Sequence, residues 1–495
     1  MRTRLVIVVA LLLLASVPHA ASASTTYLPV GDEVYPILDR LEAEGLVPSG
    51  LLDTRPISRA EAERLYREAE GNASTATPFI RSLLEALSRH LGARPMPERA
   101  SVAGSAGIRV LRTDTNLPTL QHYNDGALSA KGINVTLNAD LRVEQAGPFA
   151  FEIDPEYRET DGDDELVMRR GYAVLGISKV DAILGKESQW WGPGRHGSIL
   201  LSNNAEPFTM ALFTNPEPVE LPWILRGLGP FRFVFFATQL EKNRTDVPSP
   251  YLWGMRFDFK PHPRLEIGLE RTAILGGQKG RSDDLATWTK SIFPFHRSDN
   301  TGTLKDPGDQ RAGFSAKWNL PIQRQPVQLY VEGDGEDLHI LWPNLWAWVG
   351  GIYLPQIGPL ERIDARFEIG TTAGRRLSPT VWYNHWIYTA GYTYKGQVIG
   401  HHIGTDSRDL SAEFSYHLPE ITGRLFLAYD REEHHLREGD YKEIDHEVVT
   451  GADLYVSTHV AVAGGYSHAW VRNFANAYSP TTQINSVFGE VRYEF

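Results

Sequence analysis

The sequence predicts an all-β transmembrane barrel of about 18 antiparallel strands, with a small N-terminal α-helical domain in the periplasm. Three observations predict this fold class: an export signal, a change in apolar periodicity along the chain, and connections that are short and long in turn. We expect four segments, namely a signal peptide (1–23), a helical periplasmic domain (24–95), a linker (96–105) and an outer-membrane β-barrel (106–495).

The export signal stands at the start of the chain. Arg2 and Arg4 precede an apolar run, and Ala21-Ser22-Ala23 has the small residues of a cleavage site. This pattern is typical of a secretory signal peptide rather than of a membrane-spanning helix. The chain has no cysteine, so its stability must come from pairing and packing without disulfides. A formal net charge of −12 disfavours nucleic acid as a partner.

The helical domain is predicted from apolar residues at helical spacing. Val34, Ile37, Leu38 and Leu41 follow the i, i+3, i+4, i+7 pattern. A second helix is expected after the capping box of Ser58 and Glu61, and a third from Thr77-Pro78 to Gly92. Each helix has one apolar face and needs a partner surface, most simply the periplasmic rim of the barrel.

The period changes from 3.6 to 2 at about residue 106. In 133–144, apolar residues from Ile133 to Val143 alternate with polar ones, and 251–260 behaves in the same way. Short connections are expected near 147, 261, 321, 375 and 419. Long ones are expected near 114–130, 158–166, 242–250, 275–310, 334–360, 395–408, 434–444 and 473–482. Tight periplasmic turns opposite long outer loops are characteristic of outer-membrane barrels.

The last ten residues, SVFGEVRYEF, alternate and end on Phe495, which resembles the assembly signal of such barrels. An ordinary edge strand is the alternative. The connection at 214–230 is longer than a periplasmic turn requires.

The segment GKESQWWGPGRHGSILLSNNAEPF (185–208) carries the strongest motif. The glycines and proline within residues 187–204 exclude a helix and a central strand, so 187–204 is expected to be a shaped loop that begins on the outer side. Together with YKGQVIGHHIGTDSRDL (394–410), it resembles the Wzi-type capsule assembly proteins of the outer membrane. The resemblance implies a barrel of about 18 strands with a periplasmic helical bundle, acting as a lectin for capsular polysaccharide.

The chemistry of the loop is compatible with sugar binding. Aromatic rings can stack on sugars, amides can bond hydroxyls in both directions, and an arginine can pair with a uronate. The candidate polysaccharide-binding residues are Gln189, Trp190, Trp191, Arg195, His196, Asn203, Asn204, His401 and Asp406. The alternative is that the loop folds into the lumen and plugs it. Both roles are compatible with each other.

Other candidates are weaker. Trp342, Trp346 and Trp348 are expected in an outer loop, either as a second sugar platform or as an interfacial aromatic girdle. The acidic stretches 159–165 and 430–440 are expected to be solvated, with cation binding as the alternative. The His-His pairs at 401–402 and 434–435 lack the spacing of a metal motif, and no cofactor is expected.

The sequence therefore predicts a non-enzymatic outer-membrane protein. Its expected partners are capsular or extracellular polysaccharide, outer-membrane lipid with lipopolysaccharide, and the barrel assembly machinery. A transport pore is the main alternative, because a barrel of this size can hold a water-filled lumen. A hydrolase using His401 and Asp406 is a third possibility, although no nucleophile–base spacing is recognisable.

Overall fold

The computed structural model describes most of the chain. The described residues are 24–91, 101–116, 123–278, 282–293, 308–320, 322, 324–336, 345–373, 382–436, 441–474 and 477–495. The signal peptide predicted at 1–23 lies outside them.

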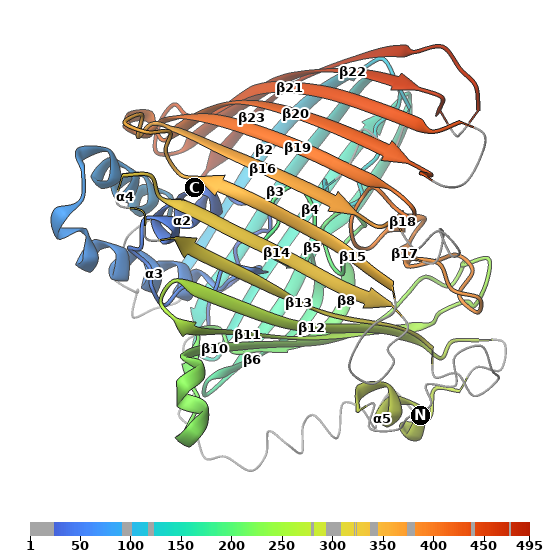
Figure 1. The fold of residues 1–495 in the computed structure, drawn as a ribbon, viewed down its shortest axis with the longest axis horizontal. Coiled ribbons are helices and arrows are strands. Elements are labelled where there is room, and N and C mark those ends of the chain that lie inside the picture. The colour runs from blue at the N-terminus through green and yellow to red at the C-terminus, as the bar shows by residue number, and fades with distance from the viewer. Residues whose placement is uncertain are drawn as a thin grey trace.

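Eighteen long antiparallel strands within these residues form a closed barrel in which each strand pairs with its neighbours along the chain (Figure 1). The strands are β2 (Ser101–Thr113), β3 (Gly132–Ala146), β4 (Phe149–Thr160), β5 (Asp163–Ile177), β6 (Val180–Glu187), β8 (Phe208–Thr214), β10 (Pro230–Gln239), β11 (Tyr251–His262), β12 (Leu265–Leu275), β13 (Asp309–Leu320), β14 (Val327–Glu336), β15 (Leu345–Leu354), β16 (Ile363–Thr371), β19 (Arg408–Leu418), β20 (Gly423–His434), β21 (Glu443–Tyr455), β22 (Val460–Arg472) and β23 (Thr482–Glu494). The last strand closes the barrel on the first, from Thr113 opposite Ser486 to Ser105 opposite Glu494. The predicted fold class is confirmed.

The first strand begins at Ser101, five residues before the expected start of the barrel and inside the expected linker. At the other end of the chain, Phe495 continues the pairing of β23, because its N–H and C=O bond with the backbone of Gly104 at 2.9 and 3.0 Å.

The helical domain lies at one end of the barrel, beside the C-terminus (Figure 1). It contains α2 (Val34–Ala43), α3 (Arg59–Asn72), the 3-10 turn η1 (Ala73–Thr75) and α4 (Pro78–Leu91). Their apolar faces form a core of their own that includes Leu38, Leu65 and Leu87. The N-cap bond of the predicted capping box is present, since the Ser58 side chain accepts the N–H of Glu61 at 3.0 Å, while the Glu61 carboxylate pairs with Arg64. No helix among the described residues is long and apolar enough to cross a membrane.

The connections at the helical end are short, with one exception, and those at the opposite end are mostly long. The exception joins β8 to β10 and holds β9 (Val219–Glu220) and the 3-10 helix η3 (Trp223–Leu228). The opposite end carries α5 (Leu285–Ile292) and the hairpin of β17 (Thr393–Tyr394) with β18 (Gln397–Val398).

Three expectations about connections are wrong. The expected outer loop at 334–360 contains the whole strand β15, because Trp346, Trp348 and two glycines look like a loop when they are read locally. The expected short turn near 375 falls in a long connection, 372–407, of which 374–381 lies outside the described residues. The acidic loop at 159–165 is a tight Asp161-Gly162 turn with φ of 53° and 85°, which fits an Asp-Gly hairpin.

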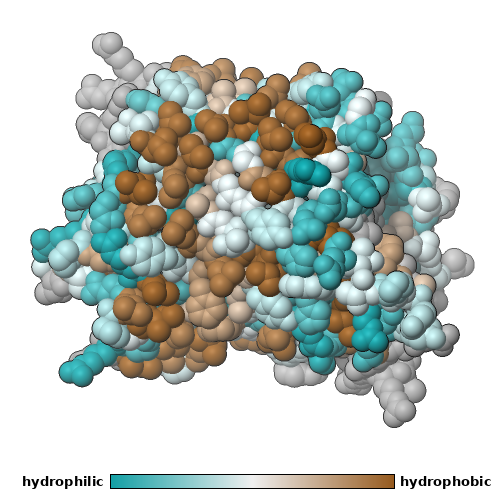
Figure 2. Space-filling view, turned by 90° about the horizontal axis from the view of Figure 1, so that it is seen from above, coloured by the Kyte–Doolittle hydropathy of each residue, from teal (hydrophilic) through white to brown (hydrophobic). Residues whose placement is uncertain are grey.

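The exterior of the barrel is apolar, and its interior is polar. Along β3, Ile133, Leu137 and Leu141 are exposed, and the charged residues of β11 and β12 that alternate with apolar ones are buried inside. Figure 2 shows apolar side chains gathered over the middle of one face, with hydrophilic ones towards both ends. This banding is the arrangement that lipid requires of a spanning barrel.

Candidate functional site: the inward-folded plug loop

The connection from β6 to β8, residues 188–207, folds into the barrel, and we call it the plug loop. Trp191 has 0% of its surface exposed and Trp190 has 4%. These two residues form β7 (Trp190–Trp191), which pairs with β1 (Thr54–Arg55) of the helical domain. A loop that starts at one end of the barrel therefore meets the N-terminal domain from the other end.

Glycines allow this close approach. Gly192 has a φ of +140°, and its N–H donates to the C=O of Asp53 at 2.8 Å. A Cβ atom at this position would collide with the carboxylate of Glu332, and one at Gly197 would collide with the ring of His401. The Trp190 indole N–H donates to the C=O of Gly194 at 3.0 Å, which closes the turn.

Two carboxylates of the barrel wall hold the backbone of the plug loop. Glu368 on β16 accepts the N–H groups of Arg195 at 2.6 Å and of His196 at 2.7 Å. Glu332 on β14 accepts the N–H of Ile199 at 2.6 Å. Charge-assisted bonds of this kind are about twice as strong as neutral ones. They satisfy donors that the lumen would otherwise leave unpaired.

The connection 382–407 covers the plug loop and forms hydrogen bonds with it at several positions. The Tyr383 hydroxyl donates to the C=O of Ile199 at 2.6 Å, and the side-chain amide of Asn204 donates to the C=O of Val398 at 2.9 Å. A third segment contributes Tyr123, whose C=O accepts from the side-chain amide of Asn203 at 3.1 Å. Both asparagines thus bond backbone groups within the protein.

Histidines and carboxylates meet beside the plug loop. His196 lies 3.5 Å from Asp409 and 3.2 Å from Asp430. Burial alone would lower the pKa of His196, but the two carboxylates together raise it well above its usual value. Burial and the neighbouring histidines lower the pKa of His401 and of His402 well below the usual value.

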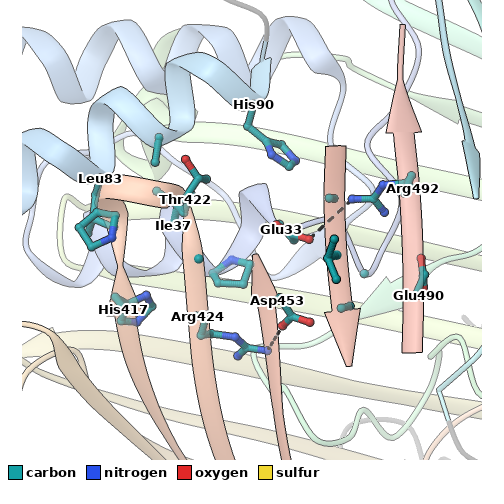
Figure 3. Close-up of a pocket in the computed structure, with 18 of the residues that line it drawn as sticks. Glu33, Ile37, Leu83, His90, His417, Thr422, Arg424, Asp453, Glu490 and Arg492 are labelled. Atoms are coloured by element: carbon teal, nitrogen blue, oxygen red, sulfur yellow. Dashed lines mark hydrogen bonds and ion pairs between the residues drawn. The ribbon is translucent and has the colours of Figure 1, made fainter. Parts of the chain in front are cut away.

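Arg195 extends towards the helical domain. Its guanidinium lies 3.9 Å from Asp39 on α2, and it lines a cavity of about 250 Å³ between the helical domain and the wall. Figure 3 shows this cavity with Glu33 facing Arg492 and Arg424 facing Asp453, at 3.6 and 3.2 Å. Burial, followed by the nearby Arg55, lowers the pKa of Arg195 to about 10, so it stays charged. This side chain is directed away from the end with the long loops.

The structure brings most of the predicted site residues together. Five of the seven on the plug loop are buried, Arg195 and His196 are half-buried, and His401 packs against the loop. Asp406 is buried with a φ of +47°, and Asp409 rather than Asp406 lies beside His401, at 3.5 Å. Direct contact of these residues with sugar stays a prediction, and their burial favours the plug interpretation. The sequence analysis missed Glu332 and Glu368, because lone carboxylates on strands carry no local motif.

Exposed aromatic residues occur in two other places. At the end with the long loops, Trp386 is 50% exposed and follows an exposed Asn384, and the His385 ring lies 6.2 Å from the Trp386 ring. On β15, Trp346 and Trp348 stack at 5.1 Å, while the alternating Ala347 and Val349 are buried. These two tryptophans thus belong to the barrel exterior, as the girdle interpretation expects, and Trp342 lies outside the described residues.

The acidic stretch at 430–440 is only partly a loop. Strand β20 continues to His434, and Asp430, Glu432 and His434 are buried in the lumen. The expectation of a solvated charge run is therefore wrong for this half. Residues 437–440 lie outside the described residues.

Known proteins resemble this chain over most of its length. The family model of the capsule assembly protein Wzi matches residues 106–484. A solved structure of Wzi from Escherichia coli, an outer membrane protein involved in group 1 capsule assembly and described as a carbohydrate-binding β-barrel, has a TM-score of 0.76. It is 19% identical and covers 95% of this chain and 100% of its own.

A curated relative shares more sequence over a shorter stretch. An uncharacterised 55.8 kDa protein from the cps region of Klebsiella pneumoniae is 36% identical over 170 residues. This match spans 34% of the present chain and about a third (33%) of the relative.

Proposed function

Because the chain belongs to the family of the capsule assembly protein Wzi, we propose that it binds capsular or other exported polysaccharide and holds it at the cell surface. It does so as an outer-membrane β-barrel with the helical domain in the periplasm. The apolar exterior contacts lipid and lipopolysaccharide, and the barrel assembly machinery recognises the terminal strand that ends in Phe495.

The observation that carries this proposal is the folded-in plug loop. A porin keeps an aqueous lumen, whereas here the plug loop and the segment around Thr54 meet inside the barrel and pair as strands. A barrel filled in this way serves as a rigid base for its outer loops rather than as a path for solutes. This arrangement favours binding over transport.

The sugar contacts are proposed on the exposed end of the molecule. Trp386 is half exposed there and offers ring surface for stacking on a sugar. The seven predicted residues of the plug loop act indirectly, because the plug loop supports the connection 382–407 that carries Trp386. His401 and Asp406 belong to this connection themselves. No chemical step is required, and the buried His401 is proposed to act in packing rather than in hydrolysis.

The test compares two exposed tryptophans at opposite ends of the barrel. Trp386→Ala removes the proposed platform, and Trp223→Ala removes a side chain that is 93% exposed at the helical end. A lost stacking contact costs about 1 kcal/mol, which corresponds to a several-fold weaker affinity at one site. We expect Trp386→Ala to lower the binding of purified polysaccharide several-fold and Trp223→Ala to leave it unchanged.

Binding is measured with detergent-solubilised protein on immobilised polysaccharide, and released polysaccharide is measured in the culture medium. The heat-modified gel shift of each variant shows that the barrel has assembled. Equal binding by the two variants would overturn the Trp386 site. Absence of binding by the wild-type protein to the polysaccharide of its own cell would overturn the proposed function itself.

A further inference from the structure

Three carboxylates converge inside the barrel next to the plug loop. They are Glu270 on β12 and Glu332 and Asp334 on β14, and their nearest ligand oxygens all lie within 4.8 Å of one another. Glu332 and Asp334 are 0% exposed and Glu270 is 4% exposed. Buried carboxylates repel one another strongly unless a cation or a proton lies between them.

The hydrogen bonding of Asp334 is unusual. Neither of its oxygens receives a hydrogen bond from an N–H or O–H group in the described part of the chain. Oxygens of the other two carboxylates lie within 4.8 Å of it. Glycine makes room for it, because Gly313 stands directly opposite on β13 and a Cβ atom there would collide with the Asp334 carboxylate.

The positive charge provided by the described side chains is insufficient for this cluster. Arg256 forms an ion pair with Glu270, but it also pairs with Asp258 at 2.8 Å. Arg311 pairs with Asp309 at 2.9 Å and with Glu336. One shared guanidinium therefore faces four carboxylates, counting Asp258, which leaves an excess of negative charge around Asp334.

We propose that Glu270, Glu332 and Asp334 bind a hard divalent cation of the calcium type. Calcium takes six to eight oxygen ligands, and oxygens on opposite sides of the ion are roughly 4.6–5.2 Å apart. Oxygens within 4.8 Å of one another can therefore ligate a single Ca²⁺. Together, the two positive charges of the ion and the single charge of Arg256 offset three of the four negative charges of Glu270, Glu332, Asp334 and Asp258.

The position of the site gives the cation a structural role. Glu332 accepts the N–H of Ile199, so the same carboxylate that binds the ion also holds the plug loop. A Cβ atom at Gly192 would collide with the other Glu332 oxygen, so the loop passes directly over the site. The cation thus fixes β12 and β14 to the plug loop and stabilises the filled lumen.

The experiment uses the full-length protein in detergent, after dialysis against EDTA. Metal analysis before dialysis is expected to find one Ca²⁺ per chain. Restoring millimolar CaCl₂ should raise the heat-modification midpoint by about 2 °C or more, because a ligand that binds only the native state stabilises it. Terbium luminescence excited through tryptophan reports binding directly, without any reference to polysaccharide.

Asp334→Asn and Glu332→Gln should each abolish the calcium shift and the terbium signal. Glu266→Gln is the matched control, since Glu266 is also a buried lumen carboxylate of β12 but pairs with Lys317 at 2.9 Å. It should keep the full response. A second readout is ion conductance in a planar bilayer, which EDTA should raise in the wild type.

Two outcomes would contradict the cation site. If Glu332 and Asp334 share a proton instead, calcium will not shift the wild-type midpoint, and Asp334→Asn will raise it in EDTA and in calcium alike. That outcome overturns the cation site. So does a wild-type response that Asp334→Asn and Glu332→Gln both retain. Neither result affects the proposed polysaccharide binding, which is measured separately.

Discussion

At the residue scale, the helical domain contains a titratable pair outside the barrel strands. His90 on α4 lies 3.2 Å from Asp32, and both side chains are largely buried. Burial would lower the pKa of His90, but its hydrogen bond with Asp32 and the charges of Asp32 and Glu33 raise it above the usual 6.5. The same pairing, acting against burial, lowers the pKa of Asp32 far below its usual value.

These shifts give a pH dependence with a definite sign. A raised histidine pKa contributes its full stabilisation below about pH 6.5 and loses it as the pH rises through the folded-state pKa. We therefore expect the helical domain to become more susceptible to protease between neutral and mildly alkaline pH. His90→Gln should cost about 1.5–3 kcal/mol at pH 6 and remove most of this pH dependence.

Limited proteolysis of purified protein across the pH range measures this effect. His262→Gln is the control, because His262 is exposed at the end of β11, at the same end of the barrel. A wild-type cleavage rate that is constant from pH 6 to alkaline pH would contradict the role of His90.

Individual residues also show which structural features were predictable from the sequence. The pairing of Ser58 with Glu61 is local and was predictable. The burial of Trp190 and Trp191 was not, because it depends on Asp53, Glu332 and Glu368, which are distant in the sequence. A Trp-Trp pair on a glycine-rich loop has the same local pattern whether it faces solvent or a lumen.

At the element scale, the plug loop is a cooperative unit held by backbone bonds to the wall, the helical domain and the connection 382–407. Changing both Trp190 and Trp191 to alanine should cost about 3–5 kcal/mol per residue and loosen this unit. We expect higher ion conductance in planar bilayers together with weaker polysaccharide binding, because the loosened plug loop no longer supports the connection 382–407. Released polysaccharide at unchanged conductance would instead favour direct sugar contact by these residues.

The matched control for this change is Trp348→Ala. Trp348 is an outward-facing residue of β15 whose loss leaves the lumen unchanged. It should keep the wild-type conductance. If both variants conduct equally, the effect comes from general destabilisation of the barrel rather than from the plug loop.

Elements were predictable where their periodicity was clean. Strands β3 and β11 alternate strictly, and the three helices show good apolar stripes. Strand β15 was missed because tryptophans and glycines resemble loop composition, and β20 was truncated because its inward residues are charged. A lumen that is polar rather than apolar inverts the usual rule that strands bury hydrophobic residues.

At the scale of the whole molecule, the even number of strands places both ends of the barrel sequence on the same side. Ser101 pairs with Glu144 of β3 and Phe495 bonds Gly104 of β2, at the end that carries α2, α3 and α4. The helical domain should therefore be cut by protease only after the outer membrane has been permeabilised. Western blots with an antibody to residues 59–91 would measure this.

Cleavage of the helical domain in intact cells would mean that the topology is inverted. The matched internal control is an epitope inserted at Tyr441, in the exposed connection between β20 and β21, which should be cut from outside.

The overall architecture was predictable because eighteen strands and two classes of connection repeat the same signal along the chain. A few local errors therefore do not change the predicted fold.

The pairing of β1 with β7 has a thermodynamic consequence that reaches beyond either strand. It joins the helical domain at one end of the barrel to a loop that also bonds the connection 382–407 at the other end. If an external ligand binds better when this loop is seated, linkage requires that the ligand tighten the seating of the helical domain by the same factor. A periplasmic protein that binds α3 would then change the affinity of the outer surface for its ligand, because the two binding equilibria would be coupled across the membrane.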